Sequence, residues 1–179
     1  MDRDHFYITL FSNASQKVYP DNKIAAFTTQ LAQPIRLDPA EIWEVGLCEL
    51  AYPEIESELE EEADSNEVYC DRFCEVTAVS EPAASGARSN LGALMYCDLI
   101  APQFIGTTRV RFLRTFNIVR DLEFLGDMLF EKVYYVPVEK KTFHNIRIEI
   151  LNLFGKHIAF KDSKTPLKVV LHFRRAITC

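Results

Sequence analysis

The sequence predicts an all-β fold, an antiparallel sandwich built from two sheets. From Leu167 to Arg174 the side chains alternate between apolar and mostly polar, which is the period of a strand with one buried face. Thirteen Phe, seven Tyr and one Trp favour strands over helices. Clusters of Pro, Gly, Asn, Asp and Ser separate the apolar runs, as turns between strands require.

Eight to ten strand candidates follow one another along the chain. They lie at residues 5–11, 25–37, 43–52, 67–79, 92–100, 109–119 and 132–138, followed by three runs at 146–150, 157–160 and 167–174. In the first of these last three, Ile146, Ile148 and Ile150 alternate with polar residues, and the stretch 152–155 can turn the chain back toward the next run.

A helical pattern is weak everywhere except at residues 120–130. There Leu122, Leu125 and Leu129 have helical spacing, so we expect a short helix or an irregular loop. Long loops between short strands favour a sandwich of Greek-key or jelly-roll type with about eight strands, and a closed barrel is the main alternative. Periodicity alone does not separate the two.

The chain has the length of one domain. Its 179 residues contain neither an internal repeat nor a long linker, so we expect one domain over residues 1–179. Two stretches are predicted to be loops. One is the acidic run at 54–67, and the other is the stretch of small residues at 81–91.

Negative charge is concentrated in the acidic run. Its sequence EIESELEEEADSNE has eight acidic and no basic side chains, so without it the formal net charge of −6 becomes +2. A nearly neutral body argues against a strongly basic nucleic-acid binder. The run lacks the spaced ligands and fixed glycine of a calcium loop, and a solvated loop is the expected structure.

The sequence predicts a protein that is not secreted. Its first residues lack the apolar segment of a secretory signal, and no apolar run approaches the length of a membrane span. Five cysteines, an odd number without framework spacing, suit free thiols in a reducing compartment.

No residue pattern indicates an enzyme, a cofactor or a metal site. Cys70 and Cys74 would stand roughly 13 Å apart on an extended strand, too far apart to share one ion. Cys97 could act as a nucleophile only if a histidine lay beside it, and nothing in the sequence brings them together. The candidates for that histidine are His144, His157 and His172.

Basic side chains form a possible track for a phosphate backbone, which we consider a minor alternative. They are Arg109, Arg111, Arg114, Lys140, Lys141, Arg174 and Arg175. Phe112 and Phe116 share the face of Val110 at strand period, which indicates a core face with the arginines at its solvated edge.

Several long segments resemble the small capsid protein of Polinton (Maverick) elements and adintovirus-like viruses. The segments include HFYITLFSNAS, WEVGLCELAYP, MYCDLIAPQFIGTTRVRFLRTF, YYVPVEKKTFHNIRIEILNLFGKHIAF and LKVVLHFRR, and the resemblance covers roughly residues 5–53 and 94–175. Phe11 stands where the family pattern leads us to expect proline, and the acidic run replaces expected aromatic residues after Pro53.

The resemblance implies a single jelly-roll penton protein. Such a protein forms a homopentamer at the fivefold vertices of an icosahedral capsid, beside a double jelly-roll major capsid protein. It would be made in the host cytoplasm or nucleus and reside in the virion. Related sequences also occur in animal genomes, so the alternative is a host-resident β-sandwich with a binding or adaptor role. That alternative predicts a monomer with one deep apolar pocket.

A subunit of a closed ring needs two different complementary faces. Tyr and Arg are enriched among the residues that dominate interfaces, and basic residues near turns and chain ends can reach neighbouring subunits. The interface candidates are therefore Tyr134, Tyr135, Lys140, Lys141, Arg174 and Arg175.

Overall fold

The computed structural model describes residues 4–56, 90–119, 125–161 and 164–176, and these residues form eleven strands and no helix. The strands are β1 (His5–Phe11), β2 (Ala26–Arg36), β3 (Trp43–Tyr52), β4 (Asn90–Cys97), β5 (Gln103–Ile105), β6 (Thr108–Val110), β7 (Phe112–Val119), β8 (Gly126–Leu129), β9 (Val136–Pro137), β10 (Thr142–Asn152) and β11 (Lys168–Arg175).

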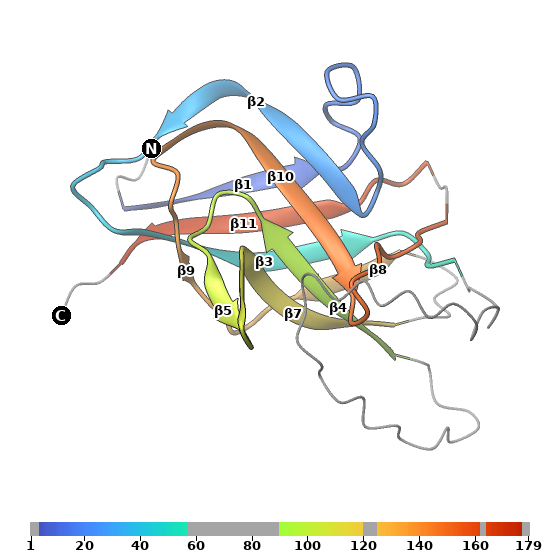
Figure 1. The fold of residues 1–179 in the computed structure, drawn as a ribbon. Coiled ribbons are helices and arrows are strands. Elements are labelled where there is room, and N and C mark those ends of the chain that lie inside the picture. The colour runs from blue at the N-terminus through green and yellow to red at the C-terminus, as the bar shows by residue number, and fades with distance from the viewer. Residues whose placement is uncertain (1–3, 57–89, 120–124, 162–163, 177–179) are drawn as a thin grey trace.

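Two antiparallel sheets make up the body of the molecule (Figure 1). The first sheet has the order β1-β11-β3-β8, and β9 also pairs with β3. The second sheet has the order β2-β10-β4-β7, while β5 and β6 form a separate hairpin. Each of the two sheets ends in edge strands and neither closes on itself, so the closed-barrel alternative is wrong.

The pairing order wraps the chain around itself as a jelly roll. Among the eight main strands the first pairs with the last, the second with the second last, and so on inward: β1 with β11, β2 with β10, β3 with β8 and β4 with β7. The pairs β11·β3 and β10·β4 then join these hairpins into two sheets. Two sheets made in this way are a single jelly roll, which confirms the predicted fold class.

The core lies between the inner faces of the sheets. On β11, Val169, Leu171 and Phe173 are fully buried, and on β10 Ile146, Ile148 and Ile150 are fully buried. Phe173 stacks on Phe143 of the opposite sheet, with ring centroids 5.8 Å apart. Alternation along each strand therefore fills one common interior, as the sequence pattern predicted.

Tyr52 provides a polar link across the core. Its side chain is almost completely buried, and its hydroxyl accepts a hydrogen bond from the backbone N–H of Val119 on the second sheet at 3.2 Å. Gly126 on β8 makes room for the ring, because a Cβ there would overlap Tyr52.

The helix or loop expected at 120–130 is wrong for residues 126–129, which form β8. These residues pair with Glu49–Tyr52 of β3, and Leu129 is left 76% exposed at the edge of the sheet. The spacing of the leucines is compatible with a helix or a strand. Backbone hydrogen bonds to the edge of β3 stabilise the strand. Residues 120–124 lie outside the described part.

Other boundaries differ from the expectation in smaller ways. The run 109–119 is divided between β6 and β7, the run 132–138 contributes only β9, and 157–160 forms isolated bridges in place of a strand. The run 67–79 lies outside the described residues. The same holds for both expected loops, except that residues 54–56 are described and residues 90–91 begin β4. Among the described residues we find no helix that could cross a membrane.

We expect Phe173→Ala to lower the free energy of unfolding by about 4 kcal/mol, because a buried ring that contacts both sheets would leave a cavity. Phe173 also stacks on Phe6, with centroids 4.9 Å apart. The measurement is urea unfolding followed by circular dichroism. Phe104→Ala, at a ring that is 73% exposed, is the control and should change stability by less than about 1 kcal/mol. Equal losses in the two variants would contradict the described core.

Candidate assembly surface

Three of the six predicted interface residues lie together on the outer face of the first sheet. Tyr134 and Tyr135 belong to the segment that precedes β9, and Arg174 projects outward from β11 between the buried Phe173 and the chain end. This region, which we call the aromatic–arginine face, also contains Tyr7, Glu44, Arg114, Phe130 and His172.

Gly46 allows the segment 133–135 to lie directly on the sheet. A Cβ on this residue would overlap the side chain of Val133 and would come within 2.7 Å of the carbonyl oxygen of Tyr134. Gly46 sits opposite His172 in the β3·β11 register, so the segment crosses the sheet beside that histidine. The absence of a side chain on β3 therefore determines where Tyr134 and Tyr135 are held.

Tyr135 is fixed by contacts to two outward side chains of β11. Its hydroxyl lies 2.7 Å from Nδ1 of His172, at hydrogen-bond distance. The guanidinium carbon of Arg174 lies 3.5 Å from the centre of its ring, a cation–π contact. Glu44 on β3 accepts hydrogen bonds from Nε and Nη2 of Arg174 at 3.2 and 3.1 Å, which hold the guanidinium over the ring.

A second cation–π contact joins this face to the other sheet. Arg114 comes from β7, and its guanidinium carbon lies 3.9 Å from the ring centre of Phe130 and 5.0 Å from that of Tyr134. Its Nη1 donates a hydrogen bond to the carbonyl oxygen of Lys132 at 2.9 Å. The segment 130–135 is therefore held by an arginine at each end.

The aromatic–arginine face presents apolar area to solvent. Tyr7 is 59% exposed and Tyr134 is 54% exposed, although both rings contact neighbours. Rigid aromatic side chains that stay exposed lose little entropy on binding, so they are suited to protein–protein contacts.

The other three predicted residues do not join this cluster. Lys140 forms an ion pair with Asp98. Lys141 donates a hydrogen bond to the carbonyl oxygen of Glu41 at 2.8 Å, and Arg175 lies 3.8 Å from the Glu41 carboxylate. Lys141 and Arg175 therefore lie together near the start of β3, away from Tyr134 and Tyr135.

Four members of the face were not among the residues predicted from the sequence as interface candidates: Tyr7, His172, Glu44 and Arg114. Strand alternation already places Tyr7 and His172 on outward positions. The missing information was the pairing of the first strand with the last, which brings the two rings into a stack with centroids 4.3 Å apart. Local patterns do not specify such long-range pairing.

The candidate thiol site gains no support. Cys97 is buried, and burial raises the pKa of its thiol to about 12, so the thiol stays protonated and is a poor nucleophile. Cys97 belongs to the second sheet, whereas His172 belongs to the first. Within the described residues, no three His, Cys, Asp or Glu side chains are arranged to hold a metal ion. Cys70 and Cys74 lie outside the described part.

The candidate basic track is divided and largely paired. Arg109, Arg111 and Arg147 line a groove of about 430 Å³ beside the β5–β6 hairpin. Arg111 forms an ion pair with Glu139, and Arg147 forms one with Glu149. Arg114 and Arg174 are part of the aromatic–arginine face instead. A continuous phosphate-binding surface is therefore not formed by these residues.

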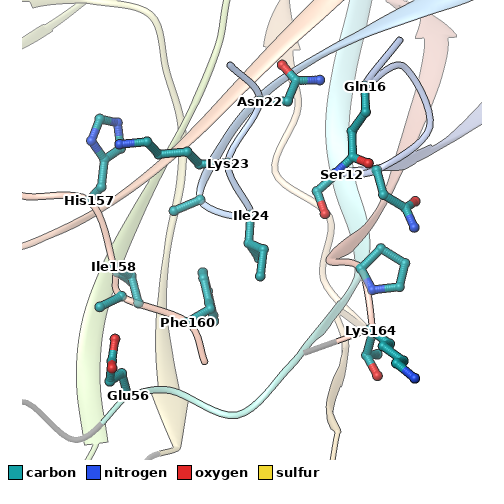
Figure 2. A pocket seen from close by; sticks show the side chains of 15 residues that line it. Ser12, Gln16, Asn22, Lys23, Ile24, Glu56, His157, Ile158, Phe160 and Lys164 are labelled. Atoms are coloured by element: carbon teal, nitrogen blue, oxygen red, sulfur yellow. The ribbon is translucent and has the colours of Figure 1, made fainter. Parts of the chain in front are cut away.

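A larger cavity, of about 550 Å³, lies at one end of the sandwich (Figure 2). It is bounded by the connection between β1 and β2 and by the connection between β10 and β11. Ile24, Ile158 and Phe160 give it apolar walls, while charged side chains such as Lys23 and Glu56 also line it. This mixed lining differs from the deep apolar pocket that a ligand-binding β-domain would need.

Comparisons with known proteins support the fold. No protein-family model and no curated protein matches the sequence. The crystal structure of the selenomethionine-labelled mavirus penton protein matches with a TM-score of 0.58 and 8% sequence identity, and the match covers 96% of this chain and 100% of that protein. The two chains share their fold, and the resemblance to a Maverick-type penton is confirmed at that level.

We expect Gly46→Ala to destabilise the protein by about 2 kcal/mol, because the new methyl group would meet the backbone of the segment 133–135. Urea unfolding measures the loss. Gly92→Ala is a matched control on the second sheet, where a Cβ would meet only the half-exposed side chain of Leu153, which can turn away. If both variants lost the same stability, Gly46 would have no special role in seating the segment.

Proposed function

We propose that this chain is the penton subunit of an icosahedral viral capsid and that five copies surround each fivefold vertex. The observation that carries the proposal is the full-length match of a single jelly roll to a penton protein. The sequence resemblance to small capsid proteins supports the same proposal. It was drawn from the sequence and does not depend on the strand pairing in the structure.

The physical character of the chain agrees with a structural role in the virion. The sandwich interior is filled by side chains from both sheets, and the one cysteine considered as a nucleophile is buried and protonated. Exposed Tyr7 and Tyr134 lie with Arg174 on one outer face, where they can contact a second protein. A double jelly-roll major capsid protein is the other partner that we propose.

In a ring of five, each subunit uses two different surfaces, because the contacts are head-to-tail. We propose the aromatic–arginine face as one of them. Its exposed Tyr7 and Tyr134 are held by neighbours in the free chain, so little order would have to be gained on assembly. Lys141 and Arg175 lie in a separate region and would belong to a different contact.

The first test is the mass of the purified full chain in solution, measured by light scattering on a sizing column over a concentration series. We expect a particle of five subunits, with or without monomer at low concentration. Mixing with the major capsid protein from the same genome should give closed shells with this chain at the vertices by electron microscopy. A monomer at every concentration that also fails to enter such shells would contradict the proposal.

The second test removes one aromatic contact from the face. Because Tyr134 is half exposed, Tyr134→Asp should leave folding intact and weaken each contact between neighbouring subunits about 30-fold, the effect of losing roughly 2 kcal/mol at one interface. Val18→Asp is matched in exposure, at 52%, and lies outside the face. Sedimentation equilibrium gives both association constants. Equal weakening by the two variants, or by neither, would rule out this face as the contact.

A further inference from the structure

His172 of β11 lies at the centre of the aromatic–arginine face, and its ring contacts groups from two other segments, β1 and the segment 133–135. Its ring stacks on Tyr7 of β1 and meets the ring of His5 edge-on, with centroids 5.3 Å apart. Its Nδ1 is hydrogen-bonded to the hydroxyl of Tyr135, which belongs to the segment 133–135. Through this histidine the segment is joined to both β1 and β11.

The environment of the ring suits a neutral imidazole. Nε2 is buried, and none of the described residues forms a hydrogen bond with it. A neutral ring that donates from Nδ1 to Tyr135 leaves an unpaired lone pair at Nε2, which costs less than an unpaired N–H on a charged ring. Protonation would place a second N–H on Nε2 with no acceptor, and a buried donor left unsatisfied is costly, more so when charged.

The charged groups around the ring also oppose protonation. The titratable and charged groups that face it are His5 and Tyr7 from β1, Glu44 and Cys48 from β3, Tyr135 from the segment, and Arg174 on β11 itself, with Arg114 of β7 beyond Cys48. The acidic group, Glu44, is already bonded to Arg174. Among the described residues, a positive ring would therefore have a guanidinium and a second imidazole beside it, and the carboxylate of Glu44 would already be paired.

We propose that His172 is a proton-controlled latch: the neutral ring fastens the segment 133–135 to the outer face of the first sheet, and protonation releases it. A protonated ring must turn to bring Nε2 to water, and this movement breaks both the stack on Tyr7 and the bond to Tyr135. The segment then loses the hydrogen bond that its last residue, Tyr135, makes to β11.

The direction of the pKa shift agrees with this geometry. Burial, followed by His5 and Arg174, lowers the pKa of His172 from its ordinary value of 6.5. The fastened state therefore binds fewer protons than the released state. Its stability is complete above the ordinary pKa and falls as the pH drops below 6.5 toward the lowered pKa.

The latch deepens the proposed function, and only its consequence for assembly depends on that function. The segment presents Tyr134 at the proposed contact between subunits, so its release would loosen the ring at acidic pH. The latch itself is a property of the single chain and can be tested without any assembly.

The test is hydrogen–deuterium exchange of the full chain, with mass spectrometry of the peptide that spans residues 131–136. After correction for the intrinsic exchange rate, we expect protection of this peptide to fall at least about threefold more than that of β10 between pH 7.5 and pH 5.0. His172→Gln, which cannot be protonated, should abolish that difference. His157→Gln replaces an exposed histidine in the connection between β10 and β11 and should leave the difference unchanged.

Three outcomes would overturn the latch. They are protection of the peptide that does not change with pH, a pH dependence that survives in His172→Gln, and a pH dependence that His157→Gln removes equally. A monomeric protein that still shows the difference would support the latch while counting against the pentamer. A pentamer that shows no difference would support the proposed function and refute the latch.

Discussion

The position of β11 between β1 and β3 is the constraint on which the rest of the structure depends. This strand forms backbone hydrogen bonds with a neighbour on each side, and its two faces have different roles. Val169, Leu171 and Phe173 fill the core, while His172 and Arg174 organise the outer surface. A shift of one residue in register would exchange these faces, so the core fixes the position of the surface cluster.

A bulge adapts β3 to this arrangement. The register between β3 and β11 shifts between Val170 and Leu171, so that Cys48 is the extra residue on β3. Beyond the bulge, Leu50 and Tyr52 return to the core, and before it Val45 and Leu47 do the same. The bulge at Cys48 lies two residues from Gly46, which provides the space where the segment 133–135 crosses the sheet.

The sequence was sufficient for the fold class because burial alternates within single strands. The run from Leu167 to Phe173 carries its own evidence of one buried face, and so does Ile146 to Ile150. Residues 126–129 carry no such evidence, because Gly126 and the spaced leucines fit several structures. These residues form a strand because β3 offers unpaired backbone groups at its edge, and β3 is distant from them in the sequence.

The same distinction applies to the candidate site. Tyr134, Tyr135 and Arg174 were predicted from residue type and from their places near a turn or the chain end, and they meet because Gly46 and Glu44 hold them in place. Lys140, Lys141 and Arg175 satisfied the same criterion and lie elsewhere with partners of their own. Residue type therefore predicts which side chains are suited to an interface, whereas the pairing of strands decides which of them act together.

The low identity to the mavirus penton protein has a physical explanation in these terms. A jelly roll requires alternating burial in each strand and a particular pairing order, and many side chains satisfy the first requirement. A match over 96% of the chain at 8% identity is thus compatible with one fold. The outer faces carry no such requirement, so the shared fold does not specify which residues lie on the outer surface of this chain. A contact proposed for this chain therefore has to be argued from its own surface, where Tyr7, Tyr135 and Arg174 are held in fixed positions around His172.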